Sequence, residues 1–275
     1  MHIINCTLIV LSLFALAAGV LAQKPDIVST REMDRINWME FGEVVPSKID
    51  TVLVPTGTLE PHGVINNGAD NTAPTAMARA IANETNSMIA PTLPYGITGS
   101  LEGYPGAFKI SEKAYRPFIK EILEGLVKNG FRNIIILNGH GGGQTAVLQS
   151  VAEEIAIEHK VRTLVINWWS FASDVTQEVF GEDGGHAGWN ENAYIQAIDP
   201  TLVHQDRYSD DLATPFPRSG TWSAYPFPSS IGLYKEGEGY VKFDQAKADE
   251  YFRKVNAKVA ALIIEVRRKW DMAKL

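Results

Sequence analysis

The run Ile134-Ile135-Ile136-Leu137 constrains the fold more than any other segment of this 275-residue chain. Consecutive large apolar residues between polar ones are typical of a strand that is buried on both faces, and such strands belong to parallel sheets covered by helices. We predict this strand over residues 131–137. A helical pattern over residues 111–128 precedes it and ends at Asn129-Gly130, a helix stop signal.

The same alternation of strands and helices extends in both directions along the chain. Further strands are predicted at residues 51–55, 88–90 and 163–168, and further helices at residues 72–86, 144–159, 190 onward and 244–268. This order predicts an α/β fold with three αβα layers and a mainly parallel central sheet, with ligands bound at the carboxyl ends of the strands. Residues 209–239, rich in Pro, Ser, Gly and aromatic residues, are expected to be an irregular excursion that walls the pocket or mediates assembly.

The first residues have the composition of a secretory signal peptide. Residues 8–21 are almost wholly apolar, and Val20-Leu21-Ala22 offers small residues for cleavage before Gln23. We therefore predict a signal peptide over residues 1–22, a single α/β domain over residues 23–275, a secreted or periplasmic location, and no stable membrane association after cleavage. Because the start of the chain lacks Lys and Arg, an uncleaved membrane anchor is the alternative.

Cysteine usage and charge narrow the chemistry. The single cysteine, Cys6, lies in the predicted leader, which leaves the mature protein without a disulfide, a thiolate ligand or a cysteine nucleophile. A metal site must then be built from His, Asp and Glu, which favours Zn²⁺, with Mn²⁺ or Fe²⁺ as alternatives. The net charge of -7 argues against a nucleic-acid partner and favours a small-molecule substrate.

Metal-ligand residues follow the first predicted strand. Glu60 and His62 are two residues apart, so on an extended strand end their side chains point the same way. Asp70 follows after a short loop rich in Gly and Asn. A carboxylate has two oxygens that can bind different ions, so we expect Asp70 to bridge two metals beside Glu60 and His62.

Two further histidines lie in glycine-rich turns. His140 stands in Asn138-Gly139-His140-Gly141-Gly142-Gly143, directly after the buried strand, and is expected to complete the nearer coordination sphere. His186 is expected to be the catalytic proton shuttle. Glu191, in the first turn of the helix that follows, is expected to serve the catalytic site and to be the last metal ligand, with Glu182 or Asp183 as alternatives. Two divalent ions about 3.5–4 Å apart make a bridging hydroxide available near neutral pH.

These motifs resemble those of the creatininase family of metal-dependent amidohydrolases. The family shows Glu-x-His-Gly with Gly-Thr-Asp, then Asn-Gly-His-Gly-Gly-Asn, then His-Ala-Gly-Glu-x-Glu-Thr-Ser. The matching segments here are residues 60–63 with 68–70, residues 138–143 and residues 186–193. The resemblance implies an αβα fold, a two-metal centre, cleavage of a non-peptide C–N bond in a small, often cyclic amide, and frequently a hexamer. It matches Glu60, His62, Asp70 and His140 to the family's ligands, and Glu191 to the remaining Glu of the third motif.

Departures from the family pattern bear on the substrate. Gly143 replaces the last asparagine of the second motif, and Gly142 stands where creatininase proper has a carboxylate. The loop before Asp70 is one residue shorter. In the third motif, the family's Glu, Thr and Ser are replaced by Trp189, Asn192 and Ala193. Creatinine itself is therefore not the expected substrate.

Taken singly, each of these residues is weak evidence for function, because it also fits an ordinary turn or helix cap. Together they predict a hydrolase with two divalent metals, and the family resemblance implies in addition that it opens a small cyclic amide and forms a homo-oligomer. The alternatives are a metal-dependent hydrolase of a cyclic ketone or lactone of a sugar or polyol, and a secreted metal- or ligand-binding protein without catalysis. Glu102 and Tyr104 are candidate substrate contacts, and one of Trp168 and Trp169 is expected in the core.

Overall fold

The computed structural model describes residues 27–182, 184–213, 221–231, 242 and 244–275. The predicted signal peptide, Asp183 and much of the 209–239 excursion lie outside the described residues. The strands are β1 Thr51–Thr56, β2 Ser87–Ile89, β3 Asn133–Asn138 and β4 Arg162–Asn167. The α-helices are α1 Trp38–Val44, α2 Ala69–Ile81, α3 Glu112–Lys128, α4 Gly142–His159, α5 Trp168–Phe171, α6 Ser173–Phe180, α7 Trp189–Ile198 and α8 Gln245–Met272. Three 3₁₀ turns, η1 Pro200–Leu202, η2 Gln205–Arg207 and η3 Asp210–Leu212, follow α7.

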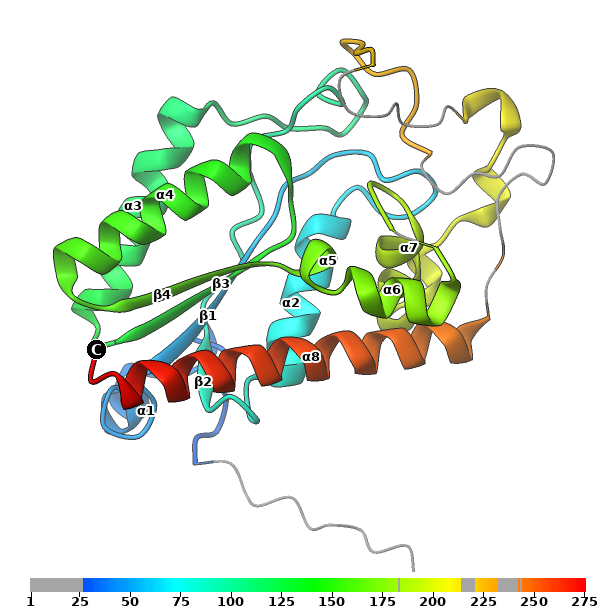
Figure 1. Cartoon of the computed structure of the whole chain (residues 1–275). Helices are drawn as coiled ribbons and strands as arrows, with labels where there is room; N and C mark the ends of the chain where they lie inside the picture. The colour runs from blue at the N-terminus through cyan, green and yellow to red at the C-terminus, as the bar shows by residue number, and fades with distance from the viewer. Residues whose placement is uncertain (1–26, 183, 214–220, 232–241, 243) are drawn as a thin grey trace, which may run out of the picture.

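The four strands form one parallel sheet in the order β2-β1-β3-β4. Strand β2 pairs with β1 on one side. The chain then returns through helix α3 to β3, which pairs with β1 on its other side (Figure 1). The strand order therefore reverses between β1 and β3. In open parallel sheets a crevice forms at this point, outside the carboxyl ends of the two strands.

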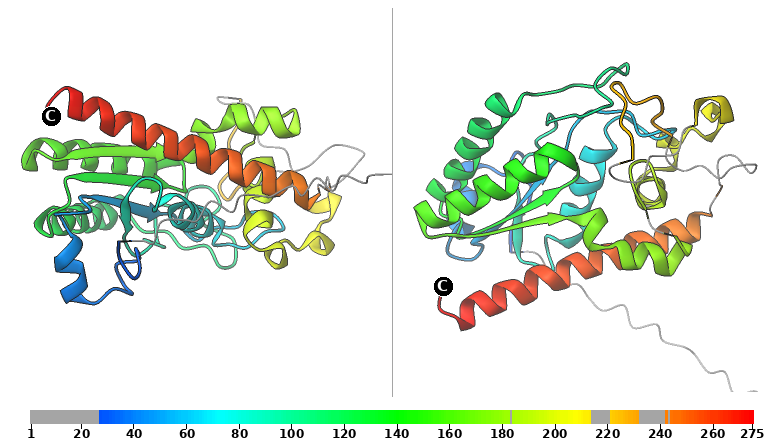
Figure 2. Two further views of the ribbon diagram at one scale, coloured as in Figure 1. Left: turned by 90° about the horizontal axis from the view of Figure 1, so that it is seen from below. Right: turned by 45° about the horizontal axis from the view of Figure 1, so that its top comes forward.

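Helices cover both faces of the sheet, so the predicted αβα architecture is confirmed. Alternate residues of β3 enter different cores: Ile134 and Ile136 pack with α3 and α4, whereas Ile135 and Leu137 pack with α2, α7 and α8. Figure 2 shows α8 running along one face of the sheet and α3 and α4 on the other. Burial of β3 on both faces explains why its sequence is continuously apolar. Within the part of the chain that the structure describes, none of the helices combines the length and apolar composition that a membrane span needs.

Several boundaries differ from those expected. Helix α2 begins at Ala69 and ends at Ile81, so Asp70 lies in its first turn rather than in a loop, and residues 82–86 are outside it. Strand β4 ends at Asn167, and Trp168 begins the short helix α5. The expected alternation of Trp168 and Trp169 on a strand is therefore wrong, although Trp168 is the buried core residue of the pair. The helices α1 and α6 had no predicted counterpart.

Two glycines allow the start of α2 to lie against the ends of β1 and β3. A Cβ atom at Gly57 would come within 2.2 Å of the Asp70 carbonyl oxygen, and one at Gly139 within 2.0 Å of the same atom. Four residues after Asp70 stands Pro74, which has no N–H to donate to that carbonyl within the helix. Glycine at both strand ends therefore fixes how closely Asp70 approaches the switch point.

This close approach predicts that Gly139→Ala destabilises the fold. The added methyl group cannot be accommodated without moving α2, so we expect a loss of about 1–3 kcal/mol in the free energy of unfolding. Gly125→Ala in the interior of α3 is the matched control, because nothing lies within 4 Å of its Cβ position. The control should gain about 0.5–1 kcal/mol from helix propensity. Urea denaturation of the variants measures both, and equal stability of Gly139→Ala and the wild type would refute the steric argument.

Candidate metal centre

Six acidic and imidazole side chains from four chain segments converge on the switch point of the sheet. The loop after β1 supplies Glu60 and His62, the first turn of α2 supplies Asp70, and the turn after β3 supplies His140. The turn before α7 supplies His186, and Glu191 lies in the first turn of that helix. The six residues form groups of three that share members, and within each group the ligand atoms lie within 4.8 Å of one another.

Asp70 is the centre of this cluster. Its Oδ1 atom lies 2.9 Å from His62 Nε2, and its Oδ2 atom lies 2.8 Å from His140 Nδ1. The carboxylate is buried, so neither oxygen is hydrated by bulk solvent. Each oxygen therefore faces a different histidine, which is the geometry of a carboxylate shared between two neighbouring positions.

The other two carboxylates lie near different histidines. Glu60 Oε1 is 3.2 Å from His140 Nδ1, and Glu191 Oε2 is 3.7 Å from His62 Nε2. Two groups result, Glu60 with Asp70 and His140, and His62 with Asp70 and Glu191, and they share Asp70. A third group joins Glu60, His62 and His186.

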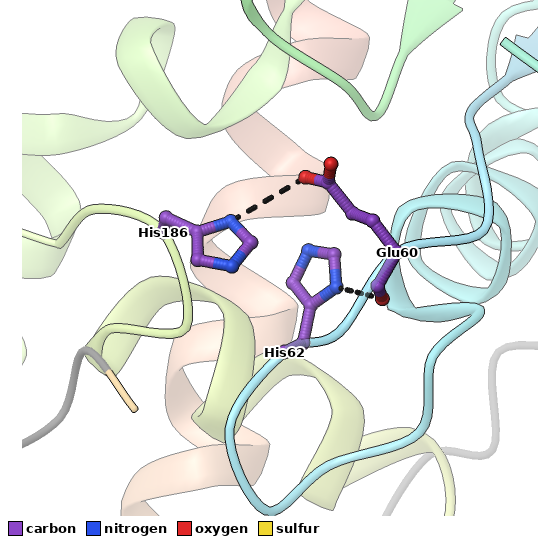
Figure 3. Close-up of side chains that lie close together, drawn as sticks. All are labelled: Glu60, His62 and His186. Carbon is purple, nitrogen blue, oxygen red and sulfur yellow. Dashed lines mark hydrogen bonds and ion pairs between the residues drawn. The ribbon is translucent and has the colours of Figure 1, made fainter. Parts of the chain in front are cut away.

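Each histidine ring is oriented by a backbone carbonyl. His62 Nδ1 donates to the Glu60 carbonyl at 2.9 Å, and His140 Nε2 donates to the Ile97 carbonyl at 3.1 Å. His186 Nε2 donates to the Pro61 carbonyl at 2.8 Å. Because a carbonyl can only accept, these nitrogens carry hydrogen, and in the neutral rings the opposite nitrogens present a lone pair toward the cluster. Figure 3 shows the His62 and His186 rings next to each other, with ring centroids 4.4 Å apart, and the Glu60 carboxylate near His186 Nδ1.

The histidine rings also set the charge balance in the metal-free protein. Burial lowers the pKa of His62, but the Asp70 and Glu191 carboxylates raise it more, to about 10. Burial likewise opposes protonation of His140, yet Asp70 and Glu60 raise its pKa well above the usual value. Burial raises the pKa of Asp70, but the two rings hold it well below its ordinary range. The buried carboxylates are thus neutralised by protons on imidazoles.

The pKa values of Glu191 and His186 shift in the directions that favour their neutral forms. Burial raises the pKa of Glu191 to about 7. Burial, together with the nearby positive charge of His62, lowers the pKa of His186 to about 4. His186 is therefore neutral at physiological pH, with its Nδ1 3.6 Å from Glu60 Oε1 and able to accept a proton.

Three helices begin at this cluster, each at a glycine without a side-chain cap. The N-caps are Gly68 for α2, Gly141 for α4 and Gly188 for α7. The positive end of a helix dipole stabilises nearby anions. The three helix N-termini therefore reduce the free-energy cost of burying the carboxylates. Two of these carboxylates, Asp70 and Glu191, lie in the first turns of α2 and α7.

Residues that depart from the family's third motif stabilise the turn before α7. Glu191 Oε2 accepts from the Ala187 amide at 2.6 Å, and Asn192 Nδ2 donates to the Ala187 and Gly188 carbonyls at 2.6 and 2.9 Å. Ala187 adopts a left-handed backbone with φ of 50°, which these bonds hold in place. Trp189 stacks on Phe180 with ring centroids 4.8 Å apart. The substituted residues thus support the turn while Glu191 faces the cluster.

An open cavity of about 320 Å³ lies over the cluster. Besides the acidic and imidazole groups, its lining includes Ile97, Gly99, Ser100, Leu101, the glycines of residues 139–143, Trp169 and Gly185. The cavity is large enough for a small molecule, and the glycines let such a molecule approach the backbone beside His140.

Some of the predicted site residues lie in the cluster and others lie outside it. The structure brings Glu60, His62, Asp70, His140, His186 and Glu191 together. Of the alternative last ligands, Glu182 is exposed and outside the cluster, and Asp183 lies outside the described residues.

The candidate substrate contacts Glu102 and Tyr104 do not line the cavity, and the neighbouring residues Ser100 and Leu101 do. Glu102 pairs with Lys109 at 2.7 Å, and Tyr104 Oη donates to the Phe227 carbonyl at 2.8 Å. Sequence reasoning also missed Ile97, because its contribution is a carbonyl that no side-chain pattern reveals. Trp169 lines the cavity, whereas its neighbour Trp168 is buried in the core.

Comparison with known proteins places the chain beside one family. The creatininase family model, described as creatinine amidohydrolase, matches residues 34–263. The creatinine amidohydrolase of Pseudomonas putida is 24% identical over 202 residues, covering 66% of this chain and 77% of that protein. A 3-dehydro-scyllo-inosose hydrolase of Thermotoga maritima is 29% identical over 168 residues, covering 57% and 53% respectively.

A third relative and the solved structures agree with this placement. The mycofactocin precursor peptide peptidase of Mycobacterium ulcerans is 27% identical over 183 residues, covering 62% of this chain and 67% of that protein. A crystal structure of creatininase superposes with a TM-score of 0.73 at 21% identity, covering 86% of this chain and 97% of that one. The structure of creatininase Mn superposes with a TM-score of 0.71 at 22% identity, covering 86% of this chain and 98% of that one. These superpositions show the same fold.

The charge balance predicts how the metal-free protein responds to Asp70→Asn. Loss of this carboxylate removes a charge that raises the pKa of His62 while burial still lowers it, so the His62 pKa should fall from about 10 by at least about one unit. Histidine NMR titration in the presence of a chelator measures this. Asp174→Asn, which removes an exposed acid paired with Lys258, is the control and should leave His62 unchanged. An unchanged His62 titration in Asp70→Asn would show that Asp70 does not set its charge.

Proposed function

This chain belongs to the creatininase family, and on that basis we propose that it is a hydrolase that holds two divalent cations and cleaves a C–N bond of a small, cyclic amide. The observation that carries the proposal is the placement of the Asp70 carboxylate, with one oxygen facing His62 and the other facing His140. The relatives named above support hydrolysis, and the peptide peptidase supports C–N bonds as the target class.

The donor set fits hard to borderline divalent cations. Carboxylate and imidazole groups suit Zn²⁺, with Mn²⁺ or Fe²⁺ as alternatives. His62 Nε2 is buried without a well-aligned hydrogen bond, although Asp70 Oδ1 is only 2.9 Å away. Such an atom is costly unless something else binds it. The structural neighbour creatininase Mn supports the same class of ion.

Each ion would be held by one of the two groups that share Asp70. Glu60, Asp70 and His140 would hold the first, and His62, Asp70 and Glu191 the second. The backbone carbonyls that orient His62 and His140 would keep the ligating nitrogens directed at the ions. When bound, the pair would lower the pKa of water and polarise the substrate carbonyl.

His186 is the residue that we assign to proton transfer. It is neutral at physiological pH, its Nε2 hydrogen is occupied by the Pro61 carbonyl, and its Nδ1 lone pair faces Glu60 at the cavity. In hydrolysis, a water proton would pass to Nδ1 while the C–O bond forms. The same proton would then pass to the departing nitrogen as the C–N bond breaks, which regenerates neutral His186.

The lining of the cavity favours a compact, uncharged ring. Among the described lining residues outside the six-residue cluster, Ser100 contributes a hydroxyl and the rest are glycine, aliphatic or aromatic side chains. The Thermotoga relative, a 3-dehydro-scyllo-inosose hydrolase, supports the alternative, which is hydrolysis of a cyclic ketone of a polyol. Secretion, homo-oligomer formation and the absence of a nucleic-acid partner stay predictions.

Metal binding should release protons, because ligation requires neutral His62 and His140. With a His62 pKa of about 10, the ring is protonated at pH 7.5, and the cation must displace that proton. The affinity should therefore rise as the pH is raised toward that pKa, about tenfold per pH unit for each proton released. Calorimetric Zn²⁺ titration of chelator-treated protein in buffers of different ionisation enthalpy measures the number of protons. A binding enthalpy independent of the buffer would contradict this charge balance.

The role of His186 predicts a specific loss of turnover. In His186→Ala, the rate on a substrate found by screening cyclic amides, imides, lactones and cyclic keto-polyols should fall by about 10²- to 10⁴-fold. Bound metal should remain near the wild-type content, because Glu60, His62, Asp70, His140 and Glu191 are unchanged. Elemental analysis and steady-state rates measure both quantities, with His159→Ala on the surface as the control. Full activity in His186→Ala would exclude the proton-transfer role, and chelation without loss of activity would exclude the metal-dependent reaction.

A further inference from the structure

Gln144 is fully buried next to the cluster and contributes no ligand atom to it. It lies in the first turn of α4, and both ends of its amide are used. Its Oε1 atom accepts from the Ile97 amide at 3.1 Å, and its Nε2 atom donates to Asn138 Oδ1 at 3.2 Å. A buried amide so connected restrains both of the groups that it joins.

Ile97 and Asn138 both hydrogen-bond to His140, Ile97 to its ring and Asn138 to its backbone. The Ile97 carbonyl accepts from His140 Nε2 at 3.1 Å and so fixes the ring and its tautomer. Asn138 holds the backbone of His140, because its Oδ1 accepts from the His140 amide at 3.2 Å and its Nδ2 donates to the His140 carbonyl at 2.6 Å. Gln144 is thus the side chain that connects the two supports of one histidine.

The sequence at residue 96 is adapted to this contact. A Cβ atom at Gly96 would lie 1.8 Å from Gln144 Oε1 and 2.7 Å from the Gly57 carbonyl oxygen. Glycine at this position therefore lets the loop that carries Ile97 lie against α4 and the end of β1. A larger residue at position 96 would displace either the Gln144 amide or the carbonyl that orients His140.

His62 is oriented by a different part of the chain. Its Nδ1 donates to the carbonyl of Glu60, two residues away in the same loop. The hydrogen bonds of the Gln144 side chain lead to the Ile97 amide, to Asn138 Oδ1 and, at 3.5 Å, to the Gly57 carbonyl. The His62 and His140 rings are therefore oriented by different carbonyls, although the two groups share Asp70.

We propose that Gln144 is a positioning residue for His140, and that it sets the affinity for the cation held by Glu60, Asp70 and His140 in preference to the cation held by His62, Asp70 and Glu191. This inference rests on the proposed two-cation function. It assigns a role to a residue outside the three motifs, and it predicts that the two cation sites can be weakened independently.

The test is a Co²⁺ titration of chelator-treated full-length protein, followed by calorimetry and by the visible absorption of the bound ion. Gln144→Met keeps the approximate volume and removes both hydrogen bonds. It should weaken one of two binding events by about 10- to 100-fold and change the absorption assigned to that event. The other event should stay within about threefold of the wild type. Gln144→Glu, which keeps an acceptor for the Ile97 amide, should lose less affinity at the same site than Gln144→Met.

Gln196→Met is the matched control, because Gln196 is also a buried glutamine of a helix and bonds to Gln245 away from the cluster. It should bind both ions as the wild type does. Equal affinities in Gln144→Met and the wild type would overturn the inference, and so would equal weakening of both events, since that marks a general loss of structure. Failure of the wild type to bind Co²⁺ would overturn the proposed function and the inference with it.

Discussion

The contact of one buried carboxylate with two imidazoles determines how the rest of this site is built. Asp70 reaches His62 and His140 at 2.9 and 2.8 Å only because α2 begins directly above the ends of β1 and β3. That position requires glycine at residues 57 and 139, where a Cβ atom would collide with the Asp70 carbonyl. The sheet order then brings the loop after β1 and the turn after β3 to the same point.

Burying three carboxylates and three imidazoles together is costly, and the structure offsets the cost in ways that also favour a cation. An unpaired buried charge costs several kcal/mol, so such groups need partners. Protons on His62 and His140 provide that neutralisation in the metal-free protein, and the starts of α2, α4 and α7 add positive dipole ends. Cations that replace these protons would neutralise the same carboxylates, and the backbone carbonyls already orient the imidazole rings to bind them.

The alternation of the four strands with their connecting helices and the six chemical groups could be predicted from the sequence, whereas helices α1 and α6 and the supports of the six groups could not. The buried run of β3 and the histidine-centred glycine turns are local patterns, and the structure brings those segments together at the sheet edge. The start of α2 was misplaced because Gly68 gives no capping signal, so Asp70 was expected in a loop. Trp168 was expected on a strand because apolar runs do not mark where β4 ends. The Ile97 amide and the Gln144 side chain are joined by a hydrogen bond across 47 residues of sequence, and no spacing rule connects the two residues.

The central claim is that Asp70 joins two cation sites, and crystallography with anomalous scattering tests it most directly. Crystals grown with Zn²⁺ and measured on both sides of the zinc absorption edge should show two peaks, one beside each oxygen of Asp70. Glu60 and His140 should lie around one peak, and His62 and Glu191 around the other. A single peak, or two peaks with the Asp70 carboxylate turned away from either, would contradict the account.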